Sequence, residues 1–286
     1  MVRRWMRTMP LYFLWLVVLG LVAFPPEGTH VFLRYFAFLQ NLAWELPPSR
    51  WFAVSWSLAV EEWFYFLFSI VFLSATALFG PRRAGLAAIA LFVAVPVVLR
   101  EGVPGIEDYG EGMLHVVVMR LDAIAYGVAF AWLWVRRSAL FRHPWIAGMA
   151  GVGLLWLFWG PKLAILLRLP AVTFLNAAMV GNGIGVCLLL AGLLALPQPP
   201  RWLVVPVRTL SNLSYAIYLI HLSVFDLILR WGSIQRIGRG GTLATIVLVT
   251  LGLAYASWRW FESPILARRP AQGRGRLPAR GAVMAG

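Results

Sequence analysis

The chain has 286 residues, of which 61% are apolar and only 13% are charged, and 15 are tryptophans. This composition excludes an ordinary soluble domain, and the long unbroken apolar runs exclude a membrane β-barrel, which needs alternating segments of about ten residues. The net charge of +14 would suggest nucleic acid in a soluble protein, but here the arginines cluster between apolar runs, so we expect membrane lipids and no nucleic acid as their partners.

We predict an all-α fold, a polytopic membrane helical bundle of about eight transmembrane helices. The apolar segments of spanning or near-spanning length are 10–24, 52–79, 85–99, 112–135, 145–160, 172–196, 209–229 and 241–261. The first and third are short for a hydrocarbon core of about 30 Å, so they would need tilting or extension into flanking residues. Residues 1–266 form the membrane domain, and residues 267–286 are expected to be a disordered basic tail.

The distribution of basic residues predicts the orientation. With both termini in the cytosol, most arginines between the apolar runs, including those of the tail, fall on the cytosolic side, as the positive-inside rule requires. A smaller set, including Arg100, is expected in outer loops. The basic start and the apolar run before Pro25 resemble a signal peptide, but no small-x-small cleavage site precedes the prolines. A first membrane span is the favoured interpretation.

The segment 30–51 contains a short aromatic stretch, Tyr35–Leu39, that ends at Gln40 and Asn41. It is too short to cross a bilayer. An interfacial or re-entrant helix is therefore expected there.

The segment Ser55–Tyr65 places two adjacent carboxylates inside an apolar run. A carboxylate at membrane depth costs roughly 2.5–3.5 kcal/mol on insertion scales, so two together indicate a function. At helical spacing Ser57, Glu61 and Tyr65 share one face, whereas Glu62 points about 100° away. This face predicts the wall of a polar cavity.

Arg120 and Asp122 lie between apolar stretches. Charges at this depth need a partner or a water-filled cavity. Two interpretations stay open: an intramembrane ion pair that sets the helix register, or a direct part in function.

Ser214, Tyr218 and His221 also share a helical face. The histidine is either an interhelical hydrogen-bonding contact or a base, because imidazole has the reference pKa suited to proton transfer near neutrality. Glu262 lies three residues after Arg259, and a local ion pair is the favoured interpretation. The four histidines and the single cysteine have no metal-ligand spacing, so no metal site is expected.

The segment Ser55–Tyr65 resembles the Trp-Ser-Leu-x-Val-Glu-x-x-Phe-Tyr signature of the acyltransferase-3 family of bacterial membrane O-acyltransferases. Other segments resemble further motifs of that family, in the same order along the chain: Arg3–Tyr12, Phe38–Leu42, Arg120–Ala123, Ser214–His221 and Phe261–Pro264. The matches extend from residue 3 to residue 264.

The resemblance implies an enzyme of the bacterial inner membrane that moves an acyl group from acyl-CoA to a hydroxyl of a cell-envelope glycan, lipid or small acceptor. It needs no bound cofactor. The implied catalytic residues are Glu61, Ser57, Tyr65 and His221, and the implied donor- or substrate-binding residues are Arg3, Arg4, Arg7, Arg120, Asp122 and Tyr215. A transporter or a non-catalytic scaffold is the alternative, because a polar path through a bundle also suits permeation.

One departure from the family pattern affects the expected activity. Family members begin with two further spans, of which the first carries an arginine and a histidine, and no residue here matches them. A late start codon or a truncated relative would explain this. We therefore expect residues 1–286 alone to insert into a membrane and to transfer acyl groups barely above background.

Overall fold

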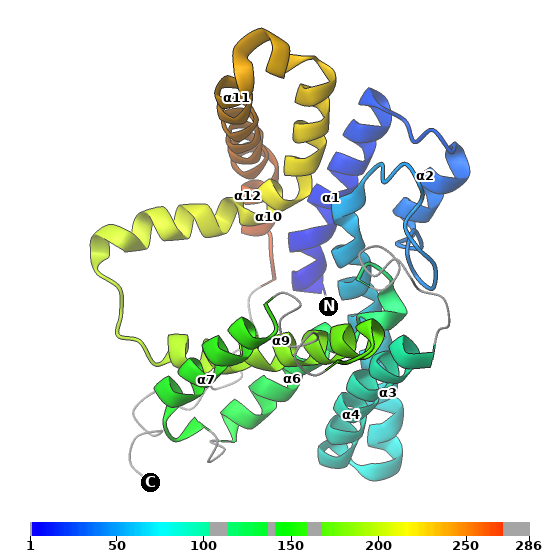
Figure 1. Ribbon diagram of the computed structural model, residues 1–286, viewed down its shortest axis with the longest axis vertical. Helices are drawn as coiled ribbons and strands as arrows, with labels where there is room; N and C mark the ends of the chain where they lie inside the picture. The colour runs from blue at the N-terminus through cyan, green and yellow to red at the C-terminus, as the bar shows by residue number, and fades with distance from the viewer. Residues whose placement is uncertain (1, 103–113, 137–140, 160–167, 271–286) are drawn as a thin grey trace. The chain divides into compact units, whose positions relative to one another are not determined.

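The computed structural model describes residues 2–102, 114–136, 141–159 and 168–270, and the structural statements below concern these ranges. Every regular element in them is helical, with no strand (Figure 1). The predicted all-α class is therefore confirmed. The helices, in chain order, are α1 (Val2–Val22), α2 (Thr29–Phe36), η1 (Ala53–Ser55), α3 (Trp56–Phe79), α4 (Pro81–Gly102), η2 (Val117–Met119), α6 (Asp122–Val135), α7 (Pro144–Leu157), α9 (Ala171–Leu194), α10 (Arg201–Arg230), α11 (Ser233–Ser257), η4 (Trp258–Glu262) and α12 (Ser263–Ala267).

Six helical stretches are long and apolar enough to cross a membrane, and α6 and α7 are shorter apolar helices of 14 residues each. All eight predicted apolar segments therefore contain a helix. The two segments that looked short are longer as helices: α1 has 21 residues and α4 has 22. At 1.5 Å per residue both reach about 30 Å, which matches a bilayer core.

The predicted span 112–135 is the one whose helix differs most from the expectation. Its first two residues lie outside the described ranges, and α6 begins only at Asp122, after the short 3₁₀ turn η2. Arg120 therefore lies in a turn before the helix, where Arg120 was expected within it.

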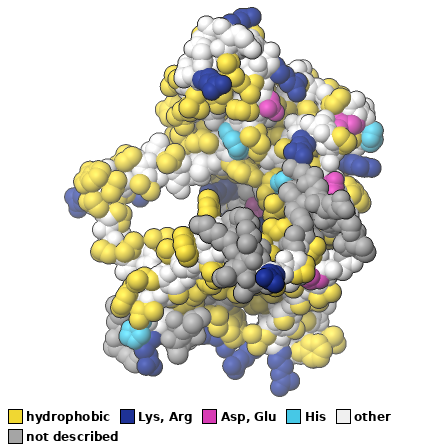
Figure 2. Space-filling view, in the orientation of Figure 1, with side chains coloured by type: hydrophobic (Ala, Val, Ile, Leu, Met, Phe, Trp, Pro, Cys, Tyr) yellow, Lys and Arg dark blue, Asp and Glu magenta, His cyan; other side chains and the backbone are white. Residues whose placement is uncertain are grey.

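The surface of the chain suits a membrane. Large apolar side chains are exposed along the helices, for example Leu21, Leu78 and Trp260, each at least 74% exposed. Hydrophobic side chains cover much of the face seen in Figure 2. Exposed apolar area on this scale is stable in lipid and not in water.

The chain divides into two compact units, which are described separately. Unit 1 comprises Met1–Ala23 and Trp202–Gly286, and unit 2 comprises Phe24–Arg201.

In unit 2, α7 packs closely along α9 through glycines (Figure 1). A Cβ at Gly148 would lie 2.9 Å from the Cα of Gly192, and a Cβ at Gly151 would lie 2.4 Å from the backbone N of Leu189. The two backbones can approach this far only because these positions lack side chains, as in other small-residue helix contacts in membranes.

A second contact in unit 2 holds the start of α3. Gln40 is fully buried and its Nε2 donates to the Oγ of Ser55 (3.2 Å). The side-chain Nδ2 of Asn41 donates to the Trp56 carbonyl oxygen, while the backbone carbonyl oxygen of Asn41 accepts from the Val117 backbone N–H. The residues after α2 therefore link the start of α3 to the segment that precedes α6. The short helix of this region, α2, has eight residues and ends at Phe36, so the rest of the predicted aromatic stretch follows it as a turn.

In unit 1, the last long helix α11 is interrupted at Gly238, which has φ +70°. Glycine adopts this left-handed backbone without steric cost. The continuous part of α11 then leads into η4, a single π-helical turn, and into α12.

Candidate functional site

The three residues predicted to share one helical face lie on α3 in unit 2. Ser57, Glu61 and Tyr65 lie on one unbroken helix and all three are half-buried. The Oγ of Ser57 donates to the Val54 carbonyl oxygen at 3.4 Å. Glu62, one position on, is also half-buried. The geometry therefore agrees with a shared face, and the roles of these residues stay predictions.

The most buried charged group in the described residues is Arg100, whose side chain is 0% exposed. Its Nη2 and Nη1 donate to the two carboxylate oxygens of Asp122 at 2.7 and 3.1 Å, and its Nε donates to Oδ1 of Asn176 at 2.8 Å. Nη1 also donates to the Met119 carbonyl oxygen. A bidentate pair with all of these hydrogen bonds compensates the desolvation of the guanidinium.

This network corrects one expectation and gives another its partner. Arg100 is not in an outer loop but is buried in the last turn of α4. The expected intramembrane ion pair exists, and it joins Asp122 to Arg100, which donates to both oxygens of the carboxylate. Residues two positions apart do not share a helix face, whereas residues of α4 and α6 can meet face to face.

Asn176 extends the network to a second carboxylate. Its Nδ2 donates to the Val97 carbonyl oxygen and to Oε1 of Glu101, both at 2.9 Å. The side chains of Arg100, Asp122 and Asn176 therefore connect α4, α6 and α9.

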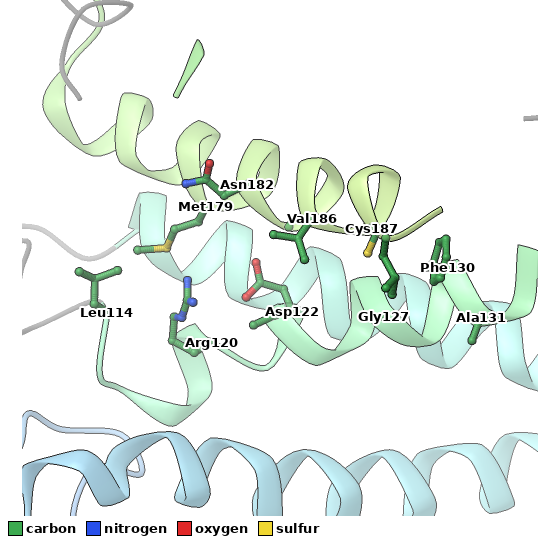
Figure 3. Close-up of a pocket in the computed structure, with 13 residues that line it drawn as sticks. Leu114, Arg120, Asp122, Gly127, Phe130, Ala131, Met179, Asn182, Val186 and Cys187 are labelled. Atoms are coloured by element: carbon green, nitrogen blue, oxygen red, sulfur yellow. The ribbon is translucent and has the colours of Figure 1, made fainter. Parts of the chain in front are cut away.

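Beside this network lies a cavity of about 650 Å³ between α6 and α9. Arg120 and Asp122 point from the beginning of α6 toward α9, where Met179, Asn182 and Val186 face them (Figure 3). Most of the remaining wall is apolar or glycine. The volume is within the range typical of small-molecule sites.

In unit 1, basic side chains gather where the start of α1 meets η4 and α12. Arg7 interacts electrostatically with the buried Glu262 and with Arg269. Arg3 also interacts with Arg269, and its Nη1 donates to the carbonyl oxygen of Pro270. Arg4, the other predicted residue of this set, is half-buried on α1.

The local pair expected between Glu262 and Arg259 does not form within the described residues. Glu262 is 6% exposed and belongs to the π-helical turn, while Arg259 is exposed. A π turn rotates successive residues by less than an α-helix, so an i,i+3 pair no longer lies on one face. Instead, Arg7 is the charged residue that acts on Glu262.

His221 lies on α10 in unit 1, half-buried. Its Nδ1 lies 2.8 Å from the Tyr218 carbonyl oxygen and 3.1 Å from that of Ile217. Because carbonyl oxygens only accept, Nδ1 carries a proton, and Nε2 is the nitrogen that can take one up. Tyr215, on the same helix, donates its hydroxyl proton to the Thr8 carbonyl oxygen at 2.6 Å and so ties α10 to α1.

The structure places Glu61, Ser57, Tyr65, Arg120 and Asp122 in unit 2. It places the other predicted residues, Arg3, Arg4, Arg7, Tyr215 and His221, in unit 1. Within the described ranges, no three His, Cys, Asp or Glu side chains form a group that could hold a metal ion.

Sequence reasoning missed three site residues: Arg100, Asn176 and Arg269. Arg100 borders an apolar run and Asn176 lies within one, so their polarity at membrane depth was a usable signal. No sequence signal distinguished Arg269 from the other tail arginines.

The helical architecture, with six helices in the described ranges that are long and apolar enough to cross a membrane, identifies the chain as a multi-pass membrane protein. Residues 1–259 match the family model described as an acyltransferase domain. The chain therefore belongs to the acyltransferase-3 family. No curated protein and no solved structure matches it.

Proposed function

We propose that this protein is a membrane O-acyltransferase that takes an acyl group from acyl-CoA and passes it to a hydroxyl of a cell-envelope acceptor. In this reaction the hydroxyl oxygen bonds to the acyl carbon, the carbon–sulfur bond breaks, and the hydroxyl proton ends on the released thiol. Family membership supports acyl transfer over the transporter and scaffold alternatives.

The observation that carries the donor proposal is the arginine cluster of unit 1. Arg3 and Arg7 both act electrostatically on Arg269, and Glu262, on which Arg7 acts, is the carboxylate beside them. The Nε and Nη2 of Arg269 have no hydrogen-bond partner in the described residues. Three guanidiniums with one carboxylate repel each other unless an anion joins them, and the phosphates of coenzyme A fit this need.

In unit 2, Glu61 is proposed to orient or charge a catalytic or substrate hydroxyl, with Ser57 and Tyr65 as its hydrogen-bond partners. In unit 1, and independently of that proposal, Nε2 of His221 is a candidate general base. The donor would be cytosolic, with both termini in the cytosol and the protein in the bacterial inner membrane.

Donor binding is the test, because it is measurable even if turnover by residues 1–286 is weak. Acetyl-CoA affinity of the purified chain should fall about tenfold in Arg7→Gln and in Arg269→Gln, since each removes charge-assisted hydrogen bonds to phosphate. Arg83→Gln, an exposed arginine at the start of α4, is the matched control and should bind normally. Unchanged affinity in Arg7→Gln, with normal membrane insertion, would remove the donor role.

A further inference from the structure

Arg120 shares its nearby carboxylate with a second arginine, because Asp122 acts electrostatically on Arg120 but is hydrogen-bonded by Arg100. The only carboxylate on its own segment, Asp122, is held on both oxygens by Arg100. The Nε of Arg120 is buried and has no hydrogen-bond partner among the described residues. Two guanidiniums that share one carboxylate leave an excess positive charge beside the half-buried Arg120, and a bound anion would neutralise it.

The cavity between α6 and α9 begins at this guanidinium and continues along an apolar wall. On α6 the wall is a small-residue stripe, Ala123, Gly127 and Ala131, which extends about 12 Å along the helix. Val186 and Leu190 of α9 face it. All of these wall side chains are exposed, so the cavity is open at the apolar surface of unit 2.

A cation at one end and a narrow apolar wall beyond it match one chemical class of ligand. We propose that this cavity binds an anionic membrane phospholipid, with its phosphate at Arg120 and an acyl chain along the α6 stripe. The phosphate supplies a negative charge to the two arginines that share Asp122, and the acyl chain packs along the exposed apolar wall. This proposal does not rest on acyl transfer, and its readout is lipid binding.

Gly127 makes it possible to test the part of the site that would hold the acyl chain. A Cβ at this position meets nothing within 4 Å, so a leucine side chain would fill the cavity without displacing the backbone. Gly153 of α7 is the matched control, because its Cβ also meets nothing within 4 Å and it does not line the cavity.

The experiment is native mass spectrometry of the purified full chain titrated with dioleoyl phosphatidylglycerol or with dioleoyl phosphatidylcholine, which has the same chains and no net charge. We expect one retained phosphatidylglycerol, bound about tenfold more tightly than phosphatidylcholine. Arg120→Gln should abolish this preference. Gly127→Leu should weaken binding about tenfold, while Gly153→Leu should bind as the unaltered chain does.

The single cysteine of the chain, Cys187, lines the same cavity and is a built-in reporter. Phosphatidylglycerol should slow its alkylation by N-ethylmaleimide, and inorganic phosphate alone should not. Equal affinity for the two lipids, or full binding by Gly127→Leu, would overturn the proposal. Protection by inorganic phosphate alone would also overturn it, since the site would then be a plain anion site.

Discussion

At the scale of single residues, Arg100 and Asp122 form a fully buried ion pair in unit 2. Removing one member leaves the other buried and unpaired, which typically costs 3–5 kcal/mol. Arg100→Met and Asp122→Leu should therefore each lower the unfolding midpoint in detergent strongly. The double variant should be more stable than either single variant, because neither Arg100 nor Asp122 is then left buried without the other. Exposed Arg82→Met is the control, and a double variant as unstable as the sum of both singles would contradict this account.

Glu61 and Glu62 present a choice between two faces of α3. Glu61 shares its face with Ser57 and Tyr65 on the intact helix. Acyl transfer, followed by mass spectrometry of envelope material in an active version of the protein, should be lost in Glu61→Gln and retained in Glu62→Gln. The opposite result would mean that the wrong face had been chosen.

At the scale of elements, the glycine contact between α7 and α9 leaves no room for side chains. Gly151→Ala would bring its Cβ within 2.6 Å of the Gly185 carbonyl oxygen. We expect a loss of about 1–3 kcal/mol from overpacking, measured as a lower thermal midpoint. Gly153→Ala on the same helix has open space and should be neutral or slightly stabilising. Equal midpoints for the two variants would mean that the helices can separate without cost.

At the scale of the whole molecule, the orientation prediction is directly measurable. Because most basic residues flank the predicted cytosolic ends of the spans, a green fluorescent protein fused to the C-terminus should fluoresce. Alkaline phosphatase at the same position should be inactive. An active phosphatase fusion would place the C-terminus outside and would also move the arginine cluster of unit 1 away from cytosolic acyl-CoA.

The sequence by itself determined the membrane class, the all-α fold and the approximate positions of the apolar helices. Apolar length and residue type are local properties, because each span must satisfy its own backbone hydrogen bonds in lipid. The shared face of Ser57, Glu61 and Tyr65 was predictable for the same reason, since helical periodicity follows from sequence spacing.

Only the tertiary structure decided the partners of the buried charges. Asp122 lies two positions from Arg120 and 22 positions from Arg100, yet it pairs with Arg100. Glu262 lies beside Arg259 in sequence, yet Arg7 of α1 acts on it. A charge in a low-dielectric interior is stabilised by the group that packing brings within hydrogen-bonding reach, and sequence distance does not determine which group that is. Arg120 has to share Asp122 with Arg100 because of these same long-range contacts.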